Sequence, residues 1–124
     1  MKPGIKLDEL IAEKVFGWEK TRNAFGNGWD LPYISNKFKK EGRRTWVRNC
    51  PKYSTDISAS WEVVEKIRKL DEGEDFVLEC VAHDGRWRCE CANKKLLIRA
   101  IEIGFTAPHA ICLVALKVLN VRHE

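Results

Sequence analysis

The dipeptide Asp84-Gly85 constrains the fold of this chain more than any other feature. It separates two runs, 76–83 and 86–92, in which apolar and polar residues alternate. A two-residue turn of type I′ needs positive φ at both positions, and Asp-Gly tolerates this while joining neighbouring antiparallel strands. The turn therefore predicts a β-hairpin. Its register sets three pairs opposite each other: Ala82 with Trp87, Cys80 with Cys89, and Leu78 with Cys91.

A second turn, at Asn93-Lys94, predicts a third strand. A tight turn there sets Cys91 opposite Leu96, Cys89 opposite Ile98 and Trp87 opposite Ala100. Both turns place the same residues on one continuous apolar face, as a consistent register requires. The other face is mixed: Val77, Glu79, Val81, Arg86, Arg88, Glu90, Leu97, Arg99, Ile101 and Ile103. We expect the first helix to cover part of this second face and another copy of the chain to cover the rest, because solvated faces carry fewer aliphatic residues.

Three segments show helical periodicity. Apolar residues recur at spacings of three and four between Leu7 and Trp18, which predicts a short amphipathic helix. Ser54 or Thr55 can cap a second helix that ends near Leu70. Its predicted buried stripe is Ile57, Trp61, Val64 and Ile67. The third helix, from Ala107 to Asn120 with Thr106 as its cap, is apolar nearly all round, which predicts that it is deeply buried or covered by a partner.

The predicted fold class is therefore α+β, with helices packed on a three-stranded antiparallel meander. Its order is helix, long loop, helix, three strands, helix. A length of 124 residues is that of one domain, so we expect a single domain over residues 1–124.

Residues 19–53, which we call the basic segment, have no sustained period and are expected to form a long loop with a short strand at 44–49 at most. The segment carries nine Lys and Arg against three acidic residues, whereas the remainder of the chain has a net charge of −2. Aromatic residues lie among these charges, including Trp29, Tyr33, Phe38, Trp46 and Tyr53. Such a mixture can neutralise phosphates and stack on bases. The alternative, which we favour, is a solvated loop that its aromatic residues attach to the core.

The predicted topology brings two helix starts, at Thr55 and Thr106, to the end of the sheet that carries the Asp84-Gly85 turn. Helix starts offer free N–H groups and a partial positive charge, which together bind anions. Four side chains would lie near that end: Lys52, His83, Arg86 and His109. The alternative is that Ser54, Thr55 and Asp56 satisfy the N–H groups themselves, and this ordinary capping is the interpretation we favour.

No motif for catalysis appears: the chain lacks G-x-S-x-G, H-E-x-x-H and a phosphate-binding P-loop. We therefore expect no enzyme, no catalytic residues and no cofactor. Cys80, His83, Cys89 and Cys91 have a spacing that fits no common zinc module, so we expect buried thiols and no metal. Five cysteines without a C-x-x-C pair favour a reducing cytoplasm. No apolar run reaches the length of a membrane span, and the N-terminus carries charges where a signal peptide is apolar.

Three blocks of sequence resemble the phage ABA sandwich domain, a family of small proteins from phages and prophages of Gram-positive bacteria. The blocks are LDELIAEKVFGW (7–18), YSTDISASWEVVEKIR (53–68) and TAPHAICLVALKVL (106–119), in the expected order. The resemblance implies helix–sheet–helix layering and, with the absence of a secretion signal, the cytoplasm of a bacterial host. The long basic segment after Trp18 departs from the family pattern.

The chain is also compatible with the anti-Thoeris sponges, which bind a cyclic ADP-ribose-type signal without cleaving it. Such a site needs cations for the pyrophosphate and an aromatic ring for the base. The residues expected to bind ligand are Trp18, Arg22, Trp29, Arg43, Arg44, Trp46, Arg86, Asn93, Thr106 and His109. Asn93 and His109 lie at opposite ends of the predicted sheet, so they can share a ligand only across subunits of a homodimer or larger homo-oligomer. The alternatives are a nucleic-acid-binding protein that uses the basic segment and a protein-binding inhibitor of a host factor.

Overall fold

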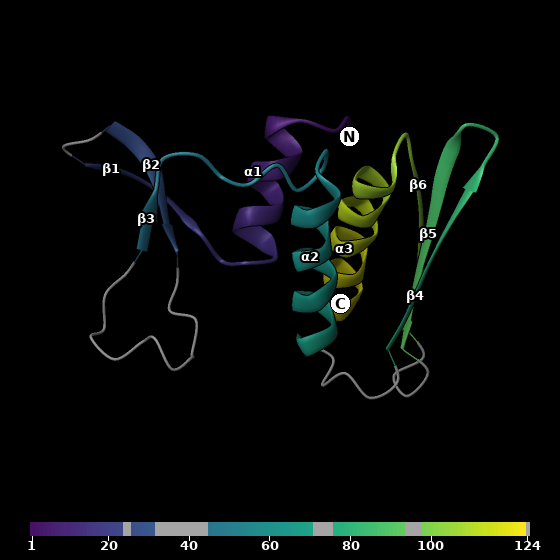
Figure 1. Ribbon diagram of the computed structural model, residues 1–124. Coiled ribbons are helices and arrows are strands. Elements are labelled where there is room, and N and C mark those ends of the chain that lie inside the picture. Colours follow the sequence, from purple (N-terminus) through teal and green to yellow (C-terminus); the bar gives the residue numbers. More distant parts are fainter. Residues whose placement is uncertain (24–25, 32–44, 71–75, 94–97, 124) are drawn as a thin grey trace.

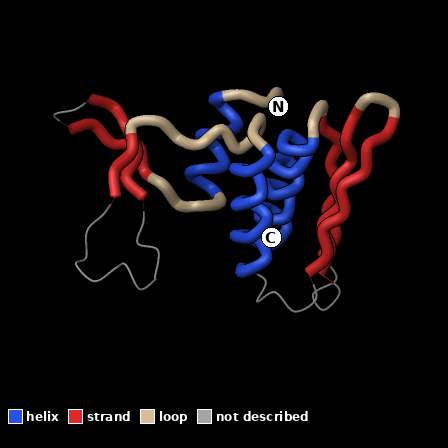
Figure 2. The backbone as a smooth tube through the Cα atoms, in the orientation of Figure 1, coloured by secondary structure: helices blue, strands red, loops and turns tan. Residues whose placement is uncertain are grey.

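The computed structural model describes residues 1–23, 26–31, 45–70, 76–93 and 98–123. The elements are α1 (Ile5–Lys14), β1 (Glu19–Asn23), β2 (Gly26–Leu31), β3 (Thr45–Val47), α2 (Ile57–Leu70), β4 (Phe76–His83), β5 (Arg86–Asn93), β6 (Ile98–Gly104) and α3 (Ala107–His123). They form two three-stranded antiparallel sheets, β1-β2-β3 and β4-β5-β6. The helices lie between the two sheets (Figures 1 and 2). The predicted α+β class is confirmed.

The hairpin at Asp84-Gly85 forms as predicted. Asp84 has φ 50° and Gly85 has φ 74°, the positive values that a type I′ turn requires. The β4–β5 register pairs Ala82 with Trp87, Cys80 with Cys89 and Leu78 with Cys91, so all three predicted pairs are confirmed. The two turn residues alone were sufficient to set this register.

The predicted β5–β6 register is wrong by four residues. Cys91 lies opposite Ala100 and not Leu96, because the last pair between the strands is Asn93–Ile98, so that four residues and not two connect them. The connection, residues 94–97, lies outside the described residues. Since four is an even number, the shift keeps each side chain on its predicted face. Ala100 is accordingly buried at 1% exposure.

The correct register places Gly104 beside the first turn of α3. A Cβ atom on Gly104 would lie 2.6 Å from the Ala110 backbone nitrogen and 2.9 Å from its Cα. These backbone atoms cannot move aside like a flexible side chain. The missing side chain therefore allows the end of β6 to approach the helix closely.

Helix α3 is the centre of the fold, and its predicted burial is confirmed. It packs against α1, α2 and all three strands of the β4-β5-β6 sheet. Its most buried apolar residues, each at 2% exposure or less, are Ala110, Ile111, Cys112, Val114, Ala115 and Val118. Thr106 is the N-cap, since its hydroxyl accepts a hydrogen bond from the His109 N–H at 3.3 Å. The helix continues to His123, beyond the predicted end at Asn120.

Helix α2 differs from the prediction in its cap and in its buried stripe. Asp56 is the cap, because its Oδ1 accepts from the Ser58 N–H at 3.0 Å. Ile57 and Trp61 are 53% and 56% exposed. Val64 and Ile67 are buried as predicted, and Ser60 and Val63 complete the buried stripe in place of the other two residues. The polar residue Ser60 tolerates burial because its hydroxyl donates to the Ile57 carbonyl at 2.9 Å.

The basic segment is not a loop throughout, contrary to the prediction. The short strand expected at 44–49 is β3, but residues before it form the β1–β2 hairpin. This hairpin is rich in Gly and polar residues and lacks clear alternation. It is held by Trp29, which is 4% exposed in the core cluster, and by Val47, which packs against that cluster. Tyr33, Phe38, Arg43 and Arg44 lie outside the described residues.

Helix α1 also departs from the prediction, because it ends at Lys14 and does not reach Trp18. It packs against α3, on the inner side of the β4-β5-β6 sheet (Figure 1). The expectation that it covers the other face of that sheet is therefore wrong. We call this uncovered face the outer face. It keeps Val77, Val81 and Ile103 exposed, at 44%, 44% and 55%.

A buried polar contact joins the N-terminus to the start of α2. Ser54, fully buried, donates from its backbone N–H to Asp8 Oδ1 at 2.7 Å and from its hydroxyl to the same oxygen at 2.6 Å. The Ser54 hydroxyl also accepts from the Gly4 N–H at 2.8 Å. Asp8 is 5% exposed. A buried carboxylate with such donors is stabilised, and the Ser54 N–H would be left unpaired without it, whereas the Ser54 hydroxyl has a second acceptor in the Gly4 carbonyl at 3.3 Å.

Asp8→Ala should therefore lower the free energy of unfolding by about 1–3 kcal/mol, because the buried Ser54 N–H loses its acceptor. Asp8→Asn keeps an acceptor oxygen of the same shape and should cost less than half as much. Urea denaturation followed by circular dichroism measures both. Equal losses in the two variants would contradict a hydrogen-bonding role for Asp8.

Candidate functional site

The candidate site is a groove between α1, the β1–β2 hairpin and the segment 48–55. Its volume is about 980 Å³. Four cationic side chains line it, Lys20, Arg22, Arg48 and Lys52, together with two carboxylates, Asp8 and Glu9. The remaining lining is polar or apolar and includes Thr21, Asn27, Trp29, Asn49, Cys50 and Thr55. With four cations against two carboxylates, the groove favours an anionic occupant.

Both carboxylates of the groove are already engaged by neighbouring groups. Asp8 accepts the hydrogen bonds from Ser54, and Glu9 Oε2 lies 3.2 Å from Lys20 Nζ. The same ammonium group lies 5.4 Å from the ring centroid of Trp29, within the range of a cation–π contact. Lys20 thus has two partners that fix its position at one wall of the groove.

Arg22 and Lys52 remain available for an anion. Neither makes an ion pair with any side chain in the described ranges of the chain. Both side chains come from the basic segment, whose charge the sequence analysis singled out. The composition therefore predicted the charge of the site, although the prediction treated most of the segment as a loop.

The thiol of Cys50 lines the groove but is a poor nucleophile. Burial is the main cause that raises its pKa to about 11, and the negative charges of Asp8 and Glu9 add to the effect. Cysteine reacts as the thiolate, so this thiol is almost wholly protonated at neutral pH.

The structure separates the residues expected to bind ligand. Arg22 and Trp29 line the groove. Trp18 packs edge-on against Tyr53, with ring centroids 6.3 Å apart, beside the core. Trp46 lies over Gly28, and its Nε1–H donates to Thr21 Oγ1 at 3.0 Å. The interpretation in which aromatic residues attach the basic segment to the core is confirmed for Trp29 and Tyr53, which are 4% and 1% exposed.

The two helix starts lie at the end of the sheet that carries the Asp84-Gly85 turn, as predicted (Figure 1). Their N–H groups have caps, however. Asp56 accepts from the first turn of α2, and Thr106 accepts from that of α3. Arg86 stacks over the ring of Phe105, 5.9 Å from its centroid. These hydrogen bonds agree with the interpretation that caps within the chain satisfy the N–H groups at both helix starts.

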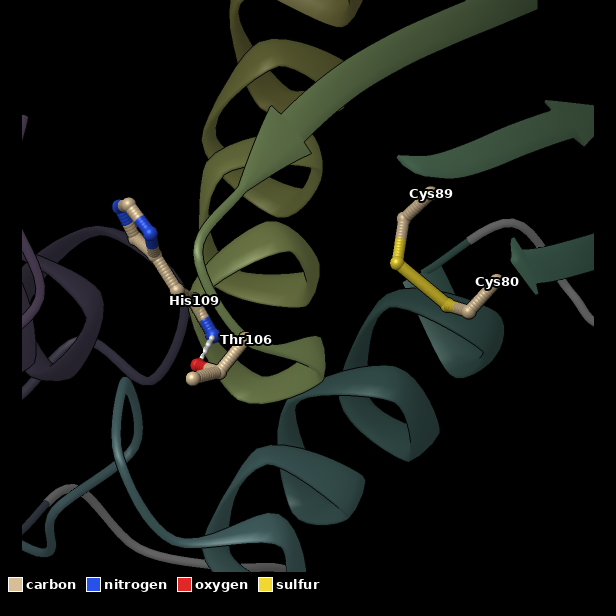
Figure 3. Close-up of a disulfide and its surroundings, with 4 residues drawn as sticks. All are labelled: Cys80, Cys89, Thr106 and His109. Atoms are coloured by element: carbon tan, nitrogen blue, oxygen red, sulfur yellow. Dashed lines mark hydrogen bonds between the residues drawn. A yellow bond between two sulfur atoms is a disulfide. The ribbon is translucent and has the colours of Figure 1, made fainter. Parts of the chain in front are cut away.

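His109 is a structural residue at the start of α3 (Figure 3). It is 3% exposed, and both ring nitrogens have partners. Nδ1 accepts from the Phe105 N–H at 2.9 Å, so the ring proton lies on Nε2, which donates to the Met1 carbonyl at 2.7 Å. His109 therefore joins the N-terminus to the β6–α3 connection. Asn93 ends β5 at the other end of the sheet, far from His109.

Cys80 and Cys89 form a disulfide between β4 and β5, where the sequence analysis expected thiols (Figure 3). The two residues lie directly opposite each other, with Cα atoms 4.2 Å apart. Cys91 and Cys112 are buried in the hydrophobic core. No three His, Cys, Asp or Glu side chains gather into a metal-binding cluster in the part of the chain that the structure describes. Among the same residues, no helix combines the length and apolarity needed to cross a bilayer.

The comparison with known families now decides the relationship. Residues 9–116 match the sequence profile of the phage ABA sandwich domain. The chain belongs to the phage ABA sandwich family. It is also similar to a phage protein from Bacillus cereus ATCC 14579 of known crystal structure, with a TM-score of 0.59 and 26% sequence identity over 94% of this chain and 90% of that chain. None of the curated proteins compared matches.

Replacing His109 tests its structural role. His109→Ala should lower the free energy of unfolding by about 2–3 kcal/mol, because the partly buried Phe105 N–H loses its acceptor and the buried side chain leaves a cavity. His83→Ala is the matched control: the His83 side chain is 81% exposed and should change stability by less than about 0.5 kcal/mol. Thermal and urea unfolding compare the two. A His109→Ala protein as stable as the control would contradict the role.

Proposed function

We propose that this phage ABA sandwich protein is a non-enzymatic binding protein that sequesters a cyclic ADP-ribose-type or cyclic nucleotide signal in the groove. The observation that supports this most is the combination of volume and charge. A groove of about 980 Å³ lies at the upper end of the range of small-molecule sites. Two of its cationic side chains, Arg22 and Lys52, have no ionic partner among the described residues, which suits a ligand with two phosphate charges.

The groups around the groove suggest how such a ligand would be held. Arg22 and Lys52 would bind phosphate oxygens, since neither has an ionic partner among the described residues. The amides of Asn27 and Asn49 and the hydroxyl of Thr55 can hydrogen-bond ribose hydroxyls or a base edge. Trp29 offers a ring to the base only if Lys20 moves from its position near that ring.

Sequestration without turnover also agrees with the chemistry of the lining. Asp8 is hydrogen-bonded to Ser54, Glu9 is paired with Lys20, and the pKa of Cys50 is raised. General acid–base or nucleophilic catalysis needs a group poised to exchange protons or attack. Asp8 and Glu9 are instead engaged by neighbouring groups, and Cys50 is held as the unreactive thiol.

Calorimetric titration with cyclic ADP-ribose and with a cyclic dinucleotide tests the proposal. We expect one of them to bind the wild-type protein and to be recovered intact after heat denaturation. Arg22→Glu and Lys52→Glu should each weaken binding by at least about tenfold, because each replaces an attraction to phosphate with a repulsion. Lys69→Glu, an exposed charge change on α2 outside the groove, should leave affinity within about twofold.

Three results would overturn the proposal. Turnover of the ligand would show an enzyme. If neither nucleotide binds, the groove does not have the proposed function. Equal binding of any polyanion, with a steep dependence on salt, would favour the nucleic-acid alternative.

Glu9→Gln gives a prediction of the opposite sign. Removing this carboxylate releases Lys20 from its ion pair and raises the net charge of the groove by one. Affinity for the nucleotide should therefore rise about three- to tenfold. The same calorimetric titration measures the change, and weaker binding would show that the Glu9–Lys20 pair positions a wall that the ligand needs.

A further inference from the structure

The ammonium group of Lys20 lies against two other residues of the groove that together suit a cation. Its Nζ is 3.2 Å from Glu9 Oε2 and 5.4 Å from the ring centroid of Trp29. All three residues line the groove. A carboxylate attracts a cation by its charge, and the face of an indole ring attracts it by the ring quadrupole. Within a groove that favours anions, Glu9 and Trp29 therefore form a place that favours a positive charge. We call this pair the cation subsite.

The ammonium group in the cation subsite is easily displaced, because it belongs to a flexible surface side chain. Lys20 lies opposite Trp29 in the β1–β2 hairpin, and its side chain is 58% exposed. Trp29 is 4% exposed and belongs to the core, and the Glu9 side chain is 28% exposed on α1. An ion pair with so exposed a lysine is weak. Glu9 and Trp29 are therefore the fixed part of the subsite, and Lys20 is an occupant that a ligand can replace.

A cation that accepts a phosphate lies close to the cation subsite. Arg22 follows Lys20 by two residues in β1, so the two side chains leave the same side of the strand from Cα atoms about 7 Å apart. Arg22 makes no ion pair with any of the described residues. In a nucleotide, one ribose separates the phosphate from the base. A phosphate on Arg22 therefore leaves the base within reach of the Trp29 ring.

We infer that the groove selects nucleotides whose base is a positively charged ring, and that this ring replaces the Lys20 ammonium in the cation subsite. The inference rests on the proposed function, because it takes the groove to be a nucleotide site. The ring stacks on Trp29 with its charge beside Glu9, while the phosphate binds Arg22 and Lys52. Lys20, once displaced, is free to turn toward the same phosphate. An uncharged base can stack on Trp29 as well, but it leaves the Glu9 carboxylate without a cation.

Calorimetric titration with the oxidised and the reduced form of nicotinamide mononucleotide tests the inference. Both forms have the same ribose and phosphate, but the base is a cationic pyridinium in the oxidised form and an uncharged ring in the reduced form. The wild-type protein should bind the oxidised form about tenfold more tightly. A groove that responds to net charge alone would instead prefer the reduced form, which is the more negative of the two. Equal affinities, a preference for the reduced form, or no binding of the oxidised form up to about 1 mM would overturn the inference.

Substitutions at the two exposed members of the contact locate the discrimination. Glu9→Gln should weaken binding of the oxidised form about three- to tenfold, whereas binding of the reduced form should rise, as for any nucleotide with an uncharged base. Lys20→Met removes the competing ammonium and should increase the preference for the oxidised form at least about threefold. Glu13→Gln is the matched control, since Glu13 is an exposed glutamate of α1 outside the groove, and it should keep the preference within about twofold. A preference that survives Glu9→Gln would contradict the cation subsite.

The outcomes separate this inference from the proposed function. Equal binding of the two mononucleotide forms would overturn selection by charge but would leave the groove as a nucleotide site. Binding of cyclic ADP-ribose or of the cyclic dinucleotide, with no binding of either mononucleotide form, would have the same consequence. A preference for the oxidised form that depends on Glu9, together with failure of both cyclic ligands, would support the cation subsite and overturn sequestration of a cyclic signal.

Discussion

The fold depends on one constraint: α3 is apolar on almost every side, and other elements must cover those sides. Its alanines and Cys112 allow close approach, and its larger residues, Ile111, Val114 and Val118, fill the space between neighbouring elements. The β4-β5-β6 sheet covers one side, α2 another and α1 a third. At about 25 cal/mol per Å² of apolar surface, covering such a helix is the largest stabilising contribution that this chain can make. The other elements can be understood by how they reach it.

The groove follows from this arrangement through α1. To pack against α3, α1 must be joined to the start of α2, and the buried contact of Asp8 with Ser54 makes that junction. The chain then leaves α1 into the β1–β2 hairpin, whose Trp29 returns to the core while Lys20 reaches back to Glu9. The hairpin thus forms one wall of the groove, and the 48–55 segment forms the other. The concave surface between them collects cations because the basic segment supplies both walls.

The sequence predicted the parts of the fold in which local chemistry determines geometry. Asp84-Gly85 admits few backbone conformations, so it set the β4–β5 register correctly. Thr106 and the apolar run after it determined the start and the burial of α3. Asn93-Lys94 was less informative, because the same residues occur in longer connections, and the β5–β6 register was wrong by an even number. On α2, periodicity alone could not show which residues complete the buried stripe. That choice depends on contact with α3.

The candidate site was predicted in its charge but not in its geometry. The excess of Lys and Arg in the basic segment is a local property of the sequence, whereas the β1–β2 hairpin has no alternation and depends on the distant residues that Trp29 contacts. His109 shows the reverse error. A histidine at a helix start suggests a ligand contact, but here its two nitrogens bind Phe105 and Met1, and only the fold brings Met1 within reach.

The distribution of charge gives the two ends of the molecule different chemistry. At the groove, Arg22 and Lys52 have no ionic partner among the described residues, and their surroundings are concave, which strengthens their field for an anion. On the outer face, Arg88 and Arg99 lie on a flat sheet and share Glu90, so little field remains beyond the surface. The same residue type, arginine, thus leaves a positive field at the groove and little field at the outer face, because curvature and pairing differ.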